Sequence, residues 1–294
     1  MHRVPSSKLP RLRRIEPGST YLITKKTNDD RFVLRPSEEL CQVLLYVLVD
    51  KACRHGILLH GFCFMSNHFH LVLTDPKGRL PAFMGEFLTD TSKAIQVLLG
   101  DDRRVWSPRR YDSVKLLDLD ATERKIAYTI LNPLQAGLTE PRDWPGLTSA
   151  RWRFGETIVA TRPEGYFSRR YRPARVSIEL IAPASASGEV EIEESCRRIA
   201  AIVDGAVEEA KCERKRAGEK LSGARRVRDT SRETRCPASK GTFNPRFASL
   251  DPALRAAAVA DDRQFRQEHE EAKRRYIAGK PRAVFPPGTY GYRQ

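Results

Sequence analysis

The stretch ILLHGFCFMSNHFHLVLT, residues 57–74, contains two runs with the apolar and β-branched content of strands. Only two polar residues separate the runs, which predicts an antiparallel hairpin. Successive side chains of a strand point to opposite faces, so His68 and His70 share one face. The other face of the same strand would carry Phe69, Leu71 and Leu73. We therefore expect the apolar face to pack and the histidine face to be available for chemistry.

The segments around this hairpin supply the other elements of a domain. The patterns predict a strand at 20–27, a helix from Ser37 to Gly56, a helix at 80–99 that ends at Gly100, a short strand after a loop at 105–111, and a helix at 121–132. The order strand, helix, strand, strand, helix, strand, helix is that of a ferredoxin-like domain with one helix added. The predicted fold class is α+β: an antiparallel sheet with helices on one face, followed by a mostly helical, basic C-terminal extension.

Composition shifts divide the chain into four parts. Residues 1–17 are basic, interrupted by prolines and without apolar periodicity, which predicts a flexible arm. Residues 18–152 carry the domain just described. Residues 153–190 include SRRYRPARV and APASASGEV, which are typical of a linker. Residues 191–294 form the helical and basic extension.

The formal net charge of +15 and the pI near 9.8 favour a polyanionic partner. We expect nucleic acid and no membrane, since the chain has no run of about 18 apolar residues. The first residues have no apolar signal-peptide core, so a cytoplasmic location is expected, with nucleoid association when DNA is bound. The six cysteines have no C-x-x-C spacing, which argues against a zinc ribbon and favours reduced thiols.

The helix predicted at 121–132 displays a second set of polar residues. Asp120 and Glu123 have capping-box spacing, and Ile126 and Ile130 mark the core stripe. At about 100° per residue, Tyr128 lies roughly 200° from both isoleucines and so points away from the core. The residues on or beside the face of Tyr128 are Asn132, Arg124 and Lys125.

Two neutral imidazoles suit a divalent cation, but they need a third donor from another element. The helix at 121–132 offers an amide oxygen and, beside it, a phenol. Tyrosine has a pKa of about 10 and is a weak nucleophile at neutral pH, which a metal bound to phosphate compensates by stabilising the developing charge.

These motifs have a family counterpart. GFCFMSNHFHLVLT resembles the HUH signature of single-tyrosine transposases, and VWSPRRY, IAYTILNPLQAGL and DWPGLTS resemble the downstream half of that domain. The Y-x-x-x-N-P-x-x-A-G-L pattern looks most like the REP-associated tyrosine transposases. The resemblance spans about residues 18–152. Met65 to Asn67 stand where a proline is common in the family, and the chain after 152 has no counterpart in the minimal domain.

The resemblance implies a role for each matched residue. His68, His70 and Asn132 would bind Mg²⁺ or Mn²⁺, and Tyr128 would be the nucleophile. The implied activity is that of a metal-dependent single-strand DNA endonuclease and strand transferase that acts on hairpin or palindromic DNA through a 5′-phosphotyrosine intermediate. The covalent bond conserves the energy of the phosphodiester, so no nucleotide cofactor is expected. The active form is expected to be a monomer or a homodimer.

DNA contacts are expected from three basic groups. The segment 211–235 has ten basic and four acidic side chains, and such a run would follow a phosphate backbone in a salt-dependent manner. The predicted DNA-binding residues are Arg109, Arg110, Arg124, Lys125, Arg225, Arg226 and Arg228.

Several residues and functions have alternatives. Tyr111 is the rival nucleophile, although packing or DNA contact fits it better. His55 and His60 have no partner at ligand spacing, which favours a surface or core role. The final segment FPPGTYGYRQ would dock on the domain or stack on bases. Trp106, Trp144 and Trp152 would pack or stack on unpaired bases. The alternative functions are a DNA-binding or regulatory protein of the same fold that does not cut, and, less favoured, a replication initiator or relaxase.

Overall fold

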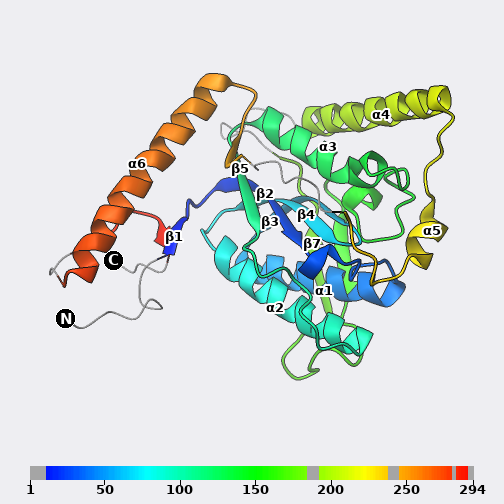
Figure 1. Ribbon diagram of the computed structural model, residues 1–294, viewed down its shortest axis with the longest axis horizontal. Helices are drawn as coiled ribbons and strands as arrows, with labels where there is room; N and C mark the ends of the chain where they lie inside the picture. Colours follow the sequence, from blue (N-terminus) through cyan, green and yellow to red (C-terminus); the bar gives the residue numbers. More distant parts are fainter. Residues whose placement is uncertain (1–10, 184–191, 238–244, 280–282, 291–294) are drawn as a thin grey trace.

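A computed structural model describes residues 11–183, 192–237, 245–279 and 283–290 (Figure 1). The strands are β1 (Arg11–Arg14), β2 (Ser19–Lys26), β3 (Leu58–Phe64), β4 (His68–Asp75), β5 (Asp112–Leu116), β6 (Thr157–Thr161), β7 (Arg175–Glu179), β8 (Phe247–Ala248) and β9 (Thr289–Tyr290). The helices are α1 (Glu38–His55), α2 (Leu80–Leu99), α3 (Leu119–Gln135), α4 (Ile192–Ala217), α5 (Ala224–Asp229) and α6 (Pro252–Ile277).

The main sheet has five strands in the order β3-β4-β2-β5-β8. β3 and β4 form the predicted antiparallel hairpin, and β2 pairs antiparallel with both β4 and β5. Strands β2 to β5 and helices α1 to α3 follow the predicted ferredoxin-like order, and the α+β class is confirmed. The short β8 adds a fifth strand parallel to β5.

Helices cover both faces of this sheet, whereas the sequence suggested one face (Figure 1). Phe69, Leu71 and Leu73 of β4 join the apolar side chains of α1 and α2 in the larger core. On the opposite face, Val72 of β4 and Ile126 of α3 share a smaller cluster. The added helix therefore lies on the histidine face, because Ile126 finds its apolar partners there.

The helix ends follow local chemistry. Ser37 accepts a hydrogen bond from the Leu40 amide, and Gly56 ends α1 in the left-handed region at φ 66°. The N-cap of α3 is Asp118, which accepts from the Ala121 amide, and not Asp120. Glu123 makes no capping box and is instead buried.

The prediction of a linker at 153–190 is wrong for the described part of this range. There, β6 and β7 form a hairpin that packs on α1. Ile158 and Ala160 alternate with exposed residues and are buried against the main core. Tyr46 of α1 donates a hydrogen bond to the Pro173 carbonyl over 2.8 Å. Residues 184–190 of the expected linker lie outside the described residues.

The C-terminal extension is helical, as predicted, but it is built into the domain. On α4, Ser195 Oγ donates to the buried carboxylate of Glu123 over 2.7 Å, and Arg198 bonds both oxygens of that carboxylate. Ile199 is buried in the smaller apolar cluster that contains Val72 and Ile126. The packing of α4 on α3 is visible in Figure 1.

The expected flexible arm is ordered from residue 11, since β1 pairs with β9. Phe285 is buried against the rings of His269 and Tyr276 of α6, so the final segment docks on the protein. Residues 1–10 and Tyr292 lie outside the described residues.

Within the described ranges, no helix is both long and apolar enough to cross a bilayer. All six cysteines are free thiols.

Candidate functional site

One cavity of about 560 Å³ brings together residues from the sheet, from α3 and from the C-terminal extension. His68 and His70 reach it from β4, and Tyr128 and Lys125 reach it from α3. Asn132, one turn after Tyr128, hydrogen-bonds with both His68 and Tyr128. The structure thus brings the four residues implied for metal binding and nucleophilic attack to one place.

The two imidazoles are held by their Nδ1 atoms. Nδ1 of His70 lies 2.9 Å from Thr24 Oγ1, across the β2–β4 pair, and Nδ1 of His68 lies 2.8 Å from Asn67 Oδ1. The rings meet edge to face with 4.9 Å between centroids. A histidine that donates Nδ1–H to such an oxygen has its lone pair on Nε2, the form that binds metals.

Burial keeps both histidines neutral. It lowers the pKa of His68 to about 4, with a further lowering by the charge of Lys26, while the hydrogen bond to Asn132 acts in the opposite direction. Burial also lowers the pKa of His70 well below its ordinary value, and the neighbouring His68 and Lys125 add to this. Neutral imidazoles at physiological pH are what a metal site requires.

Tyr128 lies between His70 and Lys125. Its ring is 5.3 Å from the His70 ring, centroid to centroid, and the Lys125 ammonium lies 5.2 Å from its centroid. Burial raises the pKa of the phenol, and the hydrogen bond from Asn132 partly offsets this. The phenol is therefore protonated at neutral pH.

The donor set for a cation consists of two imidazoles and one amide oxygen. Among the described residues, no group of three or more His, Cys, Asp or Glu side chains is placed to hold a metal ion. Any cation here would therefore rely on His68, His70 and the oxygen of Asn132, and complete its shell with phosphate or water oxygens.

A wall of the cavity comes from the C-terminal extension, which the sequence did not indicate. Arg226 and Val227 of α5 and residues on either side of that helix face the histidines. The residues that this segment contributes are Ser222, Arg226, Val227, Thr230, Cys236 and Pro245. The one available signal was the basic run at 211–235, which indicates DNA contact but not a position beside the site.

The other predicted DNA-binding residues are dispersed. Arg109 and Arg110 are exposed in the loop before β5, and Arg110 lines a separate cavity of about 220 Å³ together with Tyr111. Arg124 is exposed on α3 and is not part of the site cavity. Arg225 and Arg228 are exposed on α5, and neither lines the site cavity.

His55, His60 and the three tryptophans make contacts within the folded domain. His55 Nε2 lies 3.3 Å from Glu86, and His60 is buried between the Ile181 carbonyl and the Thr74 hydroxyl. The side chains that pack in or against the apolar cores are Trp106, Trp144 and Trp152.

No protein-family model matches the chain, and no curated protein matches it in sequence. Its structure is similar to that of a REP-associated tyrosine transposase bound to a REP hairpin, with a TM-score of 0.40 and 16% identity over 48% of this chain and 82% of that one. It is also similar to a protein of Deinococcus radiodurans R1 described as a transposase, with a TM-score of 0.29 and 20% identity over 35% of this chain and 84% of that one.

Proposed function

We propose that the protein is a metal-dependent single-strand DNA endonuclease and strand transferase of the tyrosine transposase type. The observation that carries the proposal is the convergence of Tyr128, His68 and His70, from a strand and a helix far apart in sequence, at one cavity, with Asn132 hydrogen-bonded to Tyr128 and His68. A phenol beside two neutral imidazoles is a nucleophile next to a potential metal site.

The proposed reaction begins with attack of Tyr128 Oη on a phosphorus atom of the DNA backbone. A Tyr–O–P bond forms, the bond from phosphorus to the 3′ oxygen breaks, and the phosphate stays on the 5′ end of the downstream fragment, now linked to the tyrosine. The phenol gives up one proton, and the leaving 3′ oxygen takes up one, which frees a 3′-hydroxyl. Attack by a 3′-hydroxyl on the phosphotyrosine reverses these steps and joins strands.

The residues fit a divalent cation. Nδ1 of His68 bonds to Asn67 and Nδ1 of His70 bonds to Thr24, so Nε2 is the nitrogen of each ring that could bind a metal. His68, His70 and the Asn132 oxygen would hold Mg²⁺ or Mn²⁺, although a hydrogen bond now joins His68 and Asn132. When bound, the cation would polarise a phosphate oxygen and stabilise charge that develops during attack.

Positive side chains surround the same cavity. Lys26, Lys125 and Arg226 line it, each able to contact a backbone phosphate. This supports single-stranded DNA as the substrate, in hairpin or palindromic form as the sequence resemblance implies. No nucleotide cofactor is part of the proposal, since the covalent bond to the tyrosine would conserve the energy of the phosphodiester. Such an enzyme would act in the cytoplasm, on the nucleoid.

The test is incubation of the full chain with end-labelled single-stranded and hairpin oligonucleotides and Mn²⁺ or Mg²⁺, followed by denaturing electrophoresis. We expect a shorter labelled strand and a protein-linked strand that resists boiling in detergent, and neither in excess EDTA. Binding without either product would instead favour the DNA-binding or regulatory protein that does not cut.

A further inference from the structure

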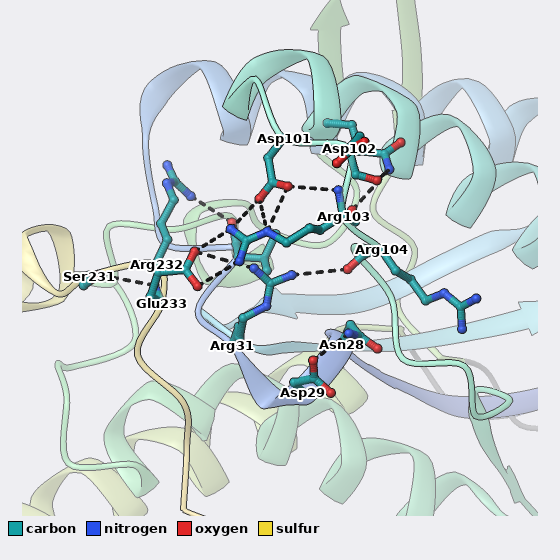
Figure 2. Close-up of polar contacts among 12 residues, drawn as sticks. Asn28, Asp29, Arg31, Asp101, Asp102, Arg103, Arg104, Ser231, Arg232 and Glu233 are labelled. Carbon is teal, nitrogen blue, oxygen red and sulfur yellow. Dashed lines mark hydrogen bonds and ion pairs between the residues drawn. The ribbon is translucent and has the colours of Figure 1, made fainter.

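A bidentate ion pair joins the C-terminal extension to the domain at one end of the main sheet (Figure 2). Nη1 and Nη2 of Arg103, in the loop after α2, donate to the two carboxylate oxygens of Glu233 over 3.0 and 2.6 Å. Nη1 of Arg31 lies 3.6 Å from the same carboxylate. Asp101 bonds Nε of Arg103 from the other side.

This ion pair is accessible to solvent. The side chains of Arg103 and Glu233 are 51% and 59% exposed, whereas that of Arg31 is 6% exposed. Exposed ion pairs contribute little to stability and are screened by salt, so a competing anion can replace the carboxylate at small cost.

The chain around Glu233 is held by other bonds. The adjacent Arg232 donates from Nη1 to the carbonyls of Val33 and Arg35 over 2.8 and 3.1 Å. Backbone bonds of 3.0 and 3.1 Å run from the Phe32 amide to the Thr234 carbonyl and from the Cys236 amide to the Asp30 carbonyl. The Glu233 side chain can therefore leave Arg103 while its backbone stays in place.

Arg31 and Arg103 interact with the carboxylate of Glu233, and Arg103 also interacts with that of Asp101. Arg232, next to Glu233 in the chain, lies close enough to Arg35 for their charges to interact. Nε of Arg35 is buried and has no hydrogen-bond partner within the described structure. Burial and the charge of Arg35 lower the pKa of Arg232. A phosphate in place of the Glu233 carboxylate would keep one negative charge beside Arg103 and Arg31.

Thr27 connects Arg31, beside this ion pair, to the candidate active site. The Thr27 hydroxyl contacts the Arg31 carbonyl at 2.6 Å and the Asn67 carbonyl at 3.0 Å, and Asn67 holds the His68 ring. A strand of DNA with one phosphate in the cavity has further phosphates along its backbone, and Arg31 and Arg103 lie beside the end of the sheet that carries His68.

We propose that Arg103 and Arg31 form a binding site for a DNA backbone phosphate, which the carboxylate of Glu233 occupies in the absence of DNA. A phosphodiester presents two non-bridging oxygens and one negative charge, so it fits the guanidinium fork that now holds the carboxylate. The inference rests on the proposed function for the identity of the ligand as DNA, but it requires no cleavage.

The test is a double-mutant cycle on DNA affinity, with Glu233→Gln, Arg103→Ala and the double variant, all carrying Tyr128→Phe so that binding alone is measured. The probe is a fluorescent single-stranded oligonucleotide with abasic positions, so that its phosphates dominate the contact. Glu233→Gln should bind about two- to fivefold more tightly, the range that corresponds to breaking an exposed ion pair. In a protein that already carries Arg103→Ala, Glu233→Gln should not increase the affinity for DNA.

A general effect of charge would instead make the two substitutions additive, which would overturn the proposal. The matched control is Glu164→Gln, which removes an exposed carboxylate paired with Arg169 at 3.3 Å in the segment between β6 and β7 and should not change affinity. Inorganic phosphate at constant ionic strength should compete only weakly. Competition as strong as that of the oligonucleotide would identify a free-phosphate site and overturn the assignment to DNA.

Amide hydrogen exchange supplies the second readout. The amides of Phe32 and Cys236 should keep their protection in Glu233→Gln, because their bonds do not involve the carboxylate. Loss of that protection would mean that Glu233 holds the chain in place and does not mask a site, and would contradict the proposal. Cleavage by the otherwise native chain without coupling between residues 103 and 233 would refute this inference alone, whereas coupling without cleavage would refute only the proposed chemistry.

Discussion

The ring of Tyr128 on α3 meets the imidazole of His70 on β4 edge to face, with 5.3 Å between centroids and 73° between planes. The contact joins the histidine face of the strand to the polar face of the helix. Tyr128, the proposed nucleophile, thus lies next to His70, a proposed metal ligand. Substitutions at single residues can test this arrangement.

Tyr128→Phe removes the phenol oxygen and keeps the ring. We expect the covalent DNA adduct to disappear and cleavage to fall at least about a thousandfold, as for loss of other nucleophiles, while DNA affinity stays within about twofold. The measurement is peptide mapping after reaction with a single-stranded hairpin, beside a binding titration. Tyr111→Phe is the control, since Tyr111 lines another cavity and should still permit the adduct. A nucleotide found on Tyr111 would reverse the assignment.

Substitution of either histidine should separate chemistry from binding. His68→Ala and His70→Ala each remove a proposed metal ligand, so cleavage should be lost in Mg²⁺ and in Mn²⁺. The affinity for hairpin DNA should stay within about threefold, because contacts to the phosphates set it. His55→Ala, beside Glu86 and outside the site cavity, should cleave normally. Full activity of His68→Ala in Mg²⁺ would refute the metal assignment.

Arg226 should contribute to DNA affinity from the wall of the cavity. Arg226→Ala should lower the log–log salt slope of single-strand binding by about 0.7, the value for one lost phosphate contact. Arg169→Ala, on an exposed arginine in the segment after β6, serves as the control. Point substitution is preferable to deletion of residues 190–294, since deletion would also remove β8 and the buried Ile199. An unchanged slope in Arg226→Ala would exclude a phosphate contact there.

The buried carboxylate of Glu123 should anchor α4. Glu123→Gln keeps its shape but removes the charge that Arg198 and Ser195 bind, so the free energy of unfolding should fall by about 1–3 kcal/mol. Urea denaturation measures this change. Glu194→Gln removes the exposed partner of the same arginine and should cost less than about 0.5 kcal/mol. Equal stabilities of the two variants would contradict the role given to Glu123.

His60 should contribute to acid sensitivity. Burial lowers its pKa in the folded state, so protonation favours the unfolded chain. Its stabilising contribution is therefore complete above the unfolded pKa of about 6.5 and decreases as the pH falls toward the folded value. Urea unfolding at pH 7.5 and pH 5.0 should show a smaller loss of stability in His60→Gln than in the native chain, by up to about 2 kcal/mol. The same loss in both proteins would argue against this assignment.

Local patterns were enough to predict the core of the fold and the faces on which His70 and Tyr128 lie. Alternation in 68–74 set the face of His70, and the angle between Tyr128 and Ile126 set the face of the helix. Both signals depend on one segment at a time, so they hold without knowledge of the packing. The N-cap of α3 was predicted wrongly because Asp118 and Asp120 are both acceptable N-caps. Which of the two caps the helix depends on where the chain leaves β5, and the cap is Asp118.

Long-range packing was not predictable. The hairpin of β6 and β7 was read as a linker, since its strands are short and its connection is rich in arginine and proline. Only contact with α1 buries Ile158 and makes the hairpin stable. The cavity wall around Arg226 likewise depends on how the extension folds back, and no periodicity in the basic run records that path.

The pairing of β1 with β9 has a consequence for biosynthesis. Arg14 lies opposite Thr289, so this two-stranded ribbon joins segments near opposite ends of the sequence. During translation the ribbon cannot form until Thr289 has left the ribosome, whereas β2 to β5 are available much earlier. The segment from β2 to β5 can therefore begin to fold during translation, while Arg11–Arg14 stays unpaired until its partner strand has been made.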